Sequence, residues 1–250
     1  MNNILIDIKN IKKQYGTREA LKGISLTIYK GEVVSLLGVN GAGKTTLSSI
    51  IATLKPPTAG DVEFEGKSIY NNLIEYRKAL GFCPQRPNLN PMLTLEDNLR
   101  FAGRYYGMTE DAITDRINTL VKQFELETYL SSSASVLSGG YKQRFLIARS
   151  LMHNPKLVIL DEPTVALDPH VRHELWQYIR SLRDLGISVL LTTHYLDEAE
   201  FLSDRVCVLD HGEVRLVDTP ANLMTAFQKS RLEDVFLQLM KEDKPTEPTN

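Results

Sequence analysis

Apolar residues alternate with polar residues along the first part of the chain. Ile4, Ile6 and Ile8 occupy every second position, and residues 24–28 repeat this spacing. A period of two places successive side chains on opposite faces of a strand. Residues 4–34 are therefore predicted to form β structure, with antiparallel strands that keep one face in water.

The pattern then changes to apolar strand, glycine-rich turn and helix. Residues 32–37 form an apolar strand, and residues 44–54 have the character of a helix that Pro56 and Pro57 stop. Residues 61–70 resemble another pair of strands. A change from a period of two to a helical period inside one stretch indicates that α and β elements pack together.

Two later segments, residues 157–160 and 188–192, are short and almost wholly apolar. Continuous apolar runs of this kind are typical of strands that are buried on both faces. A helix with Leu175, Ile179 and Leu182 on one face lies between them in the chain. Strand, helix and strand with short connections predict a parallel sheet with right-handed crossovers.

The middle of the chain, residues 95–130, is predicted to be helical. Apolar residues there fall on one helix face at a spacing of about 3.6 residues, and they are Ile113, Ile117, Leu120, Val121 and Phe124. The last residues, 241–250, are charged and contain proline. Such a composition cannot bury enough apolar surface to fold, so this tail is predicted to be disordered.

Composition narrows the class of protein. The 250 residues have a formal net charge of −2, so no nucleic-acid partner is expected. The two cysteines, Cys83 and Cys207, are far apart in sequence and are interpreted as small core residues. No apolar run approaches the roughly 20 residues that cross a bilayer. Any contact with a membrane is therefore expected to pass through a partner chain.

Residues 38–45 read GVNGAGKT, which fits the phosphate-loop pattern G-x-x-x-x-G-K-[ST]. The predicted strand before the loop and the predicted helix after it are the context that this motif requires. Its glycines leave backbone N–H groups free to surround phosphates, and the helix N-terminus adds donors and a positive dipole end. Lys44 is expected to contact the β and γ phosphates of a bound triphosphate, and the Thr45 hydroxyl to ligate Mg²⁺.

A second acidic motif lies at the end of a buried strand, where residues 157–162 read LVILDE. Ligands of open parallel sheets sit beyond the carboxyl ends of the strands. Asp161 is therefore expected to point at the Mg²⁺ ion, and Glu162 to face an attacking water as a general base. The alternative is an exposed acidic turn after a core strand, which the nearby phosphate loop makes less attractive.

Residues 137–144 read LSGGYKQR, which resembles the signature sequence of the ABC ATPase family. Further elements of that family appear in the family's order over residues 4–217. They are Tyr15 for the adenine, the Walker A loop at 38–45, Gln85 for the Q-loop, the Walker B strand at 157–163, the D-loop at 166–168 and the switch histidine His194. Judged singly, Tyr15, Gln85 and His194 could instead be a strand-end aromatic, a loop amide and a structural histidine.

The resemblance implies a fold and a domain organisation. The fold is an α/β P-loop NTPase core with a mainly parallel sheet, an N-terminal antiparallel β subdomain and an inserted α-helical subdomain that carries the signature motif. The domain is expected to span residues 4–240, with the helical subdomain at about residues 90–150 and the tail at 241–250 outside it. No internal repeat divides the chain.

The resemblance also implies the site residues. Glu162 and His194 are the expected catalytic residues, and Thr45, Gln85 and Asp161 the expected Mg²⁺ ligands. The positions expected to bind ATP are Tyr15, Gly38, Asn40, Gly41, Ala42, Gly43, Lys44, Thr45, Thr46, Gln85, Ser138, Gly139, Gly140 and Asp168. In the family, the signature serine and glycines close on the nucleotide that a second subunit holds.

Partners and location follow from the same resemblance. A second ATPase subunit is expected, as a homodimer or with a relative, together with an integral membrane permease of the ABC-2 type. The segments at 103–107, 194–200 and 231–239 favour an exporter of that group. The chain would then sit at the cytoplasmic face of the cell membrane. The alternatives are a soluble ABC ATPase of a non-transport machine, such as iron–sulfur cluster assembly, and a nucleic-acid mechanoenzyme.

Overall fold

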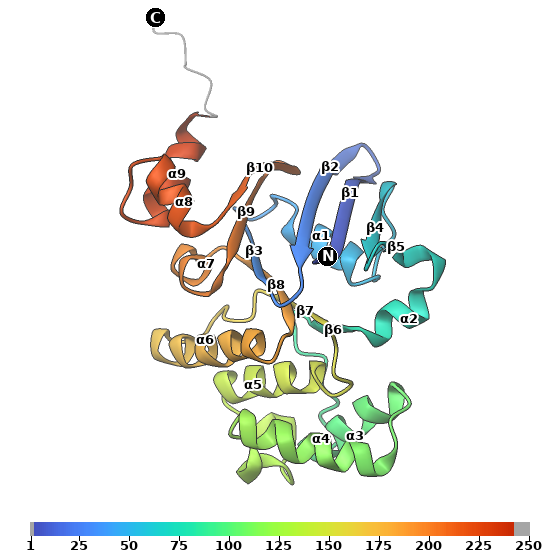
Figure 1. Cartoon of the computed structure of the whole chain (residues 1–250). Coiled ribbons are helices and arrows are strands. Elements are labelled where there is room, and N and C mark those ends of the chain that lie inside the picture. Colours follow the sequence, from blue (N-terminus) through green and yellow to red (C-terminus); the bar gives the residue numbers. More distant parts are fainter. Residues whose placement is uncertain (1–2, 243–250) are drawn as a thin grey trace, which may run out of the picture.

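Two β-sheets form the centre of the molecule in the computed structural model, which describes residues 3–242 (Figure 1). The first sheet is antiparallel and has the order β2-β1-β4-β5. Its strands are β1 (Ile4–Tyr15), β2 (Arg18–Tyr29), β4 (Ala59–Phe64) and β5 (Lys67–Ser68). The predicted alternation is visible in β1, where Ile6 and Ile8 are buried and Asp7 between them is not. This sheet is the expected antiparallel β subdomain.

The second sheet has six strands in the order β10-β9-β3-β8-β7-β6. They are β3 (Val33–Leu37), β6 (Leu80–Cys83), β7 (Leu157–Asp161), β8 (Ser188–Thr193), β9 (Arg205–Asp210) and β10 (Glu213–Asp218). The pairs among β3, β6, β7, β8 and β9 are parallel, and only the edge strand β10 is antiparallel. The expected mainly parallel sheet is confirmed.

Both faces of the parallel sheet are covered, which explains its continuous apolar strands. In β7, Val158 and Leu160 belong to a cluster with the helices on one face, whereas Ile159 belongs to a cluster with β1 and β2. The helices of the core are α1 (Lys44–Ile51), α2 (Leu73–Lys78), α6 (Pro169–Asp184) and α7 (Leu196–Leu202), and a 3₁₀ turn, η1, spans Ile69–Asn71. The two cysteines are buried, as expected.

Two element boundaries differ from the sequence expectation. The helix expected at 44–54 ends at Ile51, because Thr53 has a left-handed backbone with φ 59° that no helix continues through. The N–H groups of Thr53 and Leu54 then return to carbonyls of the last turn. The strand pair expected at 61–70 is short, since β5 has only two residues before η1 begins.

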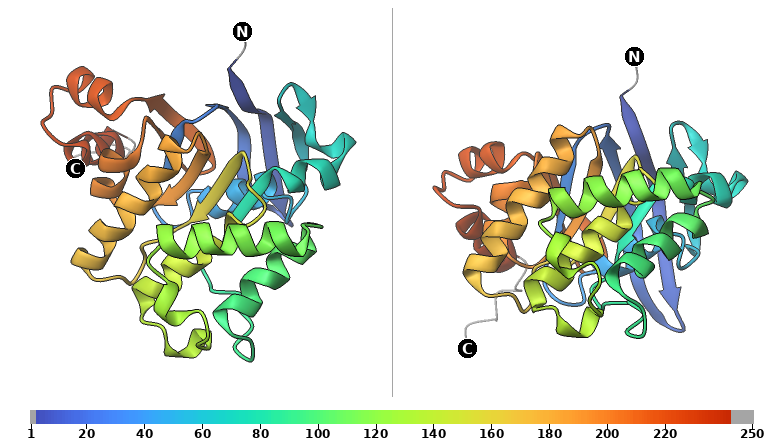
Figure 2. Two further views of the ribbon diagram at one scale, coloured as in Figure 1. Left: turned by 60° about the horizontal axis from the view of Figure 1, so that its bottom comes forward. Right: turned by 90° about the horizontal axis from the view of Figure 1, so that it is seen from below.

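The expected helical subdomain, about residues 90–150, contains three α-helices that lie in front of the parallel sheet in the view from below (Figure 2). They are α3 (Leu95–Tyr105), α4 (Glu110–Gln123) and α5 (Gly139–Ser150), with the 3₁₀ turns η2 (Glu127–Tyr129) and η3 (Ala134–Val136). The hydroxyls of Thr94 and Thr109 cap α3 and α4. The apolar face predicted for α4 is buried.

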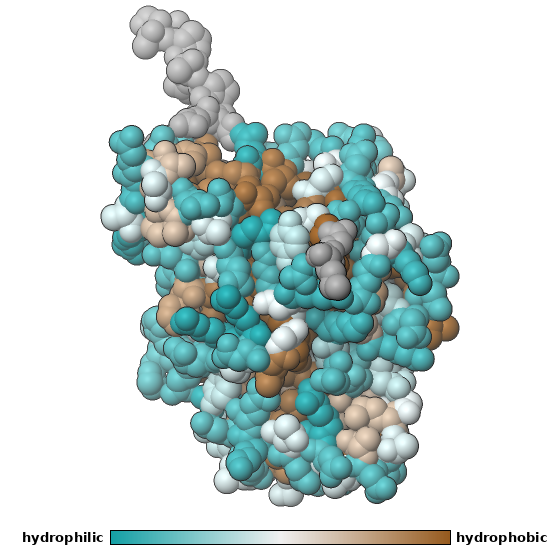
Figure 3. Space-filling model, in the orientation of Figure 1, coloured by the Kyte–Doolittle hydropathy of each residue, from teal (hydrophilic) through white to brown (hydrophobic). Residues whose placement is uncertain are grey.

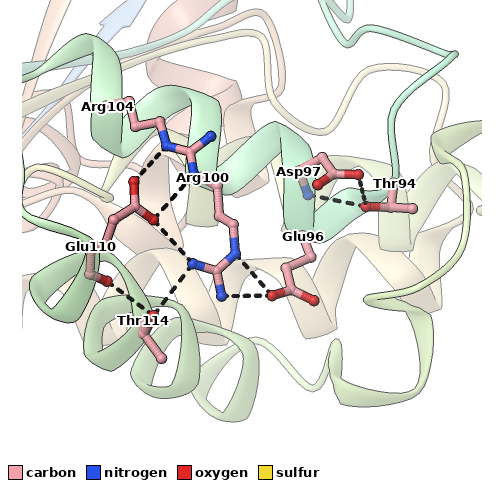
Figure 4. A network of polar contacts seen from close by, with 7 residues as sticks. All are labelled: Thr94, Glu96, Asp97, Arg100, Arg104, Glu110 and Thr114. Atoms are coloured by element: carbon pink, nitrogen blue, oxygen red, sulfur yellow. Dashed lines mark hydrogen bonds and ion pairs between the residues drawn. The ribbon is translucent and has the colours of Figure 1, made fainter.

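A polar network joins the outer faces of α3 and α4 (Figure 4). The Arg100 guanidinium lies 2.8 Å from the Glu96 carboxylate and 3.5 Å from the Glu110 carboxylate. The Arg104 guanidinium also pairs with Glu110, at 2.6 Å. These groups are largely exposed, and exposed pairs contribute little stability. The apolar faces of the two helices therefore account for most of their packing.

The C-terminal helices α8 (Pro220–Ala226) and α9 (Leu232–Glu242) pack on the outer side of β9. Leu223, Leu232 and Val235 meet Val206 and Val208 in one apolar cluster. In Figure 3 apolar side chains also gather at the top of the molecule, between these helices and β10. The predicted tail, 241–250, lies outside the described residues, except for its first two positions at the end of α9. Within residues 3–242, none of the helices combines the length and apolar character needed to span a bilayer.

Two contacts fasten the helical lobe to α6 of the core. The ring of Phe124, at the end of α4, stacks on Tyr178 with centroids 5.4 Å apart. The buried guanidinium of Arg144 in α5 pairs with Glu174 in α6 and lies over the Tyr178 ring. Both contacts meet on one face of α6, so this helix sets the position of α5 relative to the parallel sheet.

Phe124→Ala is expected to lower the free energy of unfolding by about 3–5 kcal/mol, because it empties a fully buried ring site. Urea denaturation followed by circular dichroism measures this change. Phe101→Ala is the matched control, since the Phe101 ring is exposed, and it should shift stability by less than about 0.5 kcal/mol. Equal effects of the two substitutions would contradict the assignment of Phe124 to the core.

Candidate functional site

The phosphate loop connects the end of β3 to the start of α1. Gly43 is the N-cap of α1 with φ 113°, a backbone that residues with a side chain rarely adopt. A Cβ at this position would also lie 2.7 Å from Leu21 of β2. The first N–H groups of α1 have no partner within the helix. They are therefore free to bind an anion at the mouth of the loop.

A pocket of about 370 Å³ opens above this loop. Eight of the expected residues line it, namely Tyr15, Asn40, Gly41, Gly43, Lys44, Thr45, Thr46 and Glu162. Gly38 and Ala42 belong to the same loop but are buried beneath the pocket. The pocket has the size of small-molecule sites in proteins. It gathers residues from β1, the loop, α1 and the end of β7.

Lys44 places a buried cation in this pocket. Its side chain is 4% exposed, and its Nζ donates to the carbonyl oxygens of Gly38 at 2.7 Å and Val39 at 3.2 Å. Burial lowers the pKa of the Lys44 ammonium, and the carboxylates of Glu162 and Asp161 oppose this shift. The loop thus holds a desolvated positive charge, which interacts strongly with an incoming anion.

Glu162 lies at the centre of the polar groups. Its carboxylate accepts a hydrogen bond from Gln85 Nε2 at 2.9 Å, and lies 3.8 Å from Lys44 Nζ and 3.5 Å from His194 Nδ1. Its backbone is left-handed with φ 49°, a conformation that costs free energy in any residue with a side chain. Three expected site residues from separate loops therefore converge on one carboxylate.

Asp161 directly precedes Glu162, at the end of β7, and is buried. Its Oδ1 accepts a hydrogen bond from the Thr192 hydroxyl at 2.6 Å, and the Thr45 hydroxyl also interacts with the carboxylate. Burial raises the pKa of Asp161, while the bonds from the two threonines favour its charged form. The structure thus brings Asp161 and Thr45, two of the expected Mg²⁺ ligands, into contact beside the pocket.

Tyr15 lies at the end of β1, beside the turn that joins it to β2, and is 41% exposed. The ammonium groups of Lys13 and Lys55 lie 5.2 and 5.4 Å from its ring centroid. A flat, electron-rich ring at the rim of the pocket can stack on a nucleobase. The two lysines add positive charge on the same side of the pocket.

The signature residues form a second group, outside this pocket. Ser138 is the N-cap of α5, and its exposed hydroxyl makes no capping bond. Gly140 packs so tightly on α6 that a Cβ would lie 2.4 Å from Val171. Asp168, the N-cap of α6, is exposed and its side chain also makes no capping bond. Ser138, Gly139 and Asp168 therefore lie exposed at the surface, and the side chains of Ser138 and Asp168 do not cap the helices they begin.

Three residues near the pocket were not expected from the sequence. Arg18 and Ala20, from the start of β2, line it, and the Arg18 guanidinium lies against the loop at Gly41. The Thr192 hydroxyl donates to Asp161 and accepts the N–H of Glu162 at 3.0 Å. Arg18 follows Tyr15 by only one turn of a β-hairpin, so a basic residue at this spacing was the available signal.

A parallel α/β sheet whose strand–loop–helix unit holds a buried lysine under an anion-binding pocket defines a P-loop nucleoside triphosphatase. The sequence profile of the ABC transporter family matches residues 21–165, more than half of the chain. Nod factor export ATP-binding protein I of Rhizobium sp. (strain N33) is 38% identical over 224 residues, which cover 90% of this chain and 74% of the relative.

Solved structures agree with this likeness. An ATP-binding subunit of an ABC transporter has a TM-score of 0.85 and 32% identity, covering 94% of this chain and 99% of that chain. A dimeric ATP-binding cassette in a post-hydrolysis state, bound to ADP and Pi, has a TM-score of 0.78 and 32% identity, covering 86% of this chain and 98% of that chain. The chain belongs to the ABC transporter family. It is an ATP-binding subunit that hydrolyses ATP to drive transport, and such subunits work as dimers with membrane permeases.

Arg18→Ala is expected to raise the KM for ATP about three- to tenfold and to leave kcat within about twofold. Arg18 lines the pocket, and a cation that binds the triphosphate away from the reacting centre contributes uniform binding. Within residues 3–242 its guanidinium has no other ion-pair or hydrogen-bond partner, so little else changes. Phosphate release at varied ATP concentration gives both constants. Lys67→Ala, at a residue of β5 that does not line this pocket, is the control. An unaltered KM in Arg18→Ala would contradict a role of Arg18 in binding ATP.

Proposed function

We propose that this chain is the ATPase subunit of an exporter, in which Glu162 is the general base that activates water against magnesium–ATP. The observation that carries this proposal is the convergence of Lys44, Gln85 and His194 on the Glu162 carboxylate beside the phosphate loop. A base must lie within reach of the reacting water, and a carboxylate at the γ-phosphate end of the pocket meets that need.

ATP binding divides among the residues of the pocket. Tyr15 stacks on adenine, and the backbone N–H groups of loop residues that line the pocket, Gly41 and residues 43–46, surround the phosphates. Lys44 contributes its charge at the β and γ phosphates, where its buried position makes the interaction strong. His194, which is partly exposed and 3.5 Å from Glu162, contacts the γ-phosphate and helps to position the water. These roles combine binding of the triphosphate with orientation of the nucleophile.

The residues beside the pocket also fit a magnesium ion. Asp161, Thr45 and Gln85 offer only oxygen ligands, and Mg²⁺ prefers one or two protein oxygens together with phosphate oxygens and water. Asp161 and Thr45 already interact through their side chains. When bound, the ion neutralises charge on the β and γ phosphates. Gln85 also donates a hydrogen bond to Glu162, so it would connect the ion to the proposed base.

The second group of residues completes the site of a facing subunit. Ser138 and Gly139 are exposed at the N-terminus of α5, where a helix end favours an anion. In a head-to-tail dimer they and the backbone at Gly140 reach the γ-phosphate bound to the partner, and Asp168 lies beside this seam. Because the contact needs the γ-phosphate, ATP favours closure more than ADP does.

The membrane partner is an integral permease of the ABC-2 type, and the chain sits at the cytoplasmic face of the membrane. Relatives at 38–40% identity are named as Nod factor export ATP-binding proteins, which supports export. Residues 85–95 connect Glu162, through Gln85, to the start of α3. This segment passes movement at the nucleotide to the permease.

Glu162→Gln is expected to bind ATP normally, to lose turnover by about 10²-fold or more and to accumulate an ATP-dependent dimer, because only the base is removed. Phosphate release, nucleotide binding and size-exclusion chromatography with ATP measure these three properties. Glu127→Gln, on an exposed turn, is the control and should behave as the unaltered protein. Hydrolysis close to normal would remove Glu162 from the role of base.

Affinity purification from detergent-solubilised membranes is expected to recover a polytopic partner with this chain. The segment 85–95 is the proposed contact, so Met92→Glu, which places a charge at an 88% exposed apolar side chain, should reduce recovery severalfold. ATPase activity of the isolated variant should remain. Recovery of a soluble partner alone would overturn the assignment to transport.

A further inference from the structure

Glu198, in the first turn of α7, is a fully buried acidic residue that none of the roles above uses. Its Oε1 accepts hydrogen bonds from the Thr164 hydroxyl at 2.7 Å and from the Trp176 indole N–H at 2.9 Å. Its Oε2 has no hydrogen-bond partner of normal geometry among the described residues. Burying a carboxyl group that is half satisfied costs free energy, so stability alone does not account for it.

The partners of Glu198 come from segments that carry the catalytic groups. Thr164 lies two residues after Glu162, and Thr193, whose hydroxyl also interacts with the Glu198 carboxyl, directly precedes His194. Trp176 belongs to α6, the helix that begins after Asp168. One carboxyl group thus touches the segment after β7, the end of β8 and the helix that supports the signature region.

The segment that follows β7 needs such support. Glu162 and Ala166 have left-handed backbones, with φ 49° and 61°, and Thr164 lies midway between them. Residues in this region of backbone space persist only where surrounding contacts fix them. Thr164 is 1% exposed, and Glu198 is the acceptor for its hydroxyl. The hydrogen bond between Thr164 and Glu198 therefore fixes the middle of the strained segment 162–166.

Burial raises the pKa of Glu198, whereas the bonds from Thr193, Thr164 and Trp176 favour its charged form. Either protonation state keeps Oε1 as an acceptor for Thr164 and Trp176. The hydrogen bonds to Thr164 and Trp176 therefore require an acceptor oxygen at the position of Oε1, and they do not require the negative charge of Glu198. Glu198→Gln, which keeps an acceptor oxygen, should therefore behave differently from Glu198→Ala, which removes it.

We propose that Glu198 is a positioning residue that holds Glu162 and His194 at the separation that ATP hydrolysis requires. This inference rests on the proposed roles of those two residues. Glu198 does not touch the nucleotide pocket, whose lining includes no residue of α7. It acts by tying the segment of the base to the segment of the histidine, and small misplacements of reacting groups are costly in rate.

The test compares Glu198→Ala with Glu198→Gln. The truncation removes the acceptor and is expected to lower kcat about tenfold or more, with the KM for ATP within about twofold. The amide keeps an acceptor oxygen and should retain at least about a third of kcat. Rates are measured well below the melting temperature of each variant. Equal losses of kcat and of folded protein, or a normal kcat in Glu198→Ala, overturn the proposal.

Thr164→Val keeps the test decisive if the truncated protein fails to fold. It removes the hydroxyl that donates to Glu198 and should copy the selective loss of kcat. Glu200→Ala is the matched control on the same helix, because its carboxylate instead accepts the N–H of Leu232 in α9, and its kcat should be normal. A normal kcat in folded Thr164→Val counts against the proposal.

Glu162→Gln separates failure of this inference from failure of the proposed function. If Glu162→Gln hydrolyses ATP normally, the proposed base is wrong and Glu198 has nothing to position. If Glu162→Gln is inactive but Glu198→Ala and Thr164→Val keep normal kcat, only this inference fails. In a Glu162→Gln background, adding Glu198→Ala should lower the residual rate little further, because residues that act as a unit are not additive.

Discussion

The attraction between the buried Lys44 ammonium and the two carboxylates at the end of β7 is the interaction on which the site depends. Asp161 and Glu162 raise the pKa of Lys44 against the effect of burial, and Lys44 in turn favours the charged form of Asp161. A pocket that contained only the cation or only the carboxylates would hold unpaired buried charge. The pairing keeps the pocket charged and open to the triphosphate of ATP.

The parallel sheet makes this pairing possible. β3 ends at the phosphate loop, β7 ends at the carboxylates and β8 ends next to His194, and β8 lies between the other two. Parallel neighbours present their carboxyl ends at one edge, so three segments far apart in sequence deliver their side chains to one place. Thr192 of β8 then bonds to both Asp161 and the N–H of Glu162, which fixes the two strand ends in register.

Contiguous patterns made much of this predictable. The loop at 38–45 could be predicted because one local stretch contains the strand end, the glycines, the lysine and the helix start. Periods of two and of about 3.6 likewise predict the antiparallel sheet and α4. The predicted end of α1 was wrong because nothing in the local sequence indicates the left-handed backbone of Thr53. Arg18 and Glu198 were missed since their contacts depend on tertiary packing, and Thr164 and Glu198 are 34 residues apart.

The polar groups predicted to bind the nucleotide lie on two separate surfaces of the chain, the pocket above the phosphate loop and the starts of α5 and α6. The phosphate loop has its own cation and carboxylates, whereas Ser138 and Asp168 begin helices with side chains that cap nothing. Ser, Thr, Asp and Asn at such positions usually bond to the first turn, so an exposed polar group without that bond is available to a ligand. Gly140, pressed against Val171, fixes α5 on α6 and so fixes where Ser138 points. Because α5 and α6 are in such close contact, any shift of α6 relative to the pocket also moves the Ser138 hydroxyl. Glu198 accepts hydrogen bonds from Trp176 of α6 and from Thr164, two residues after Glu162, so it links α6 to the segment that contains Glu162.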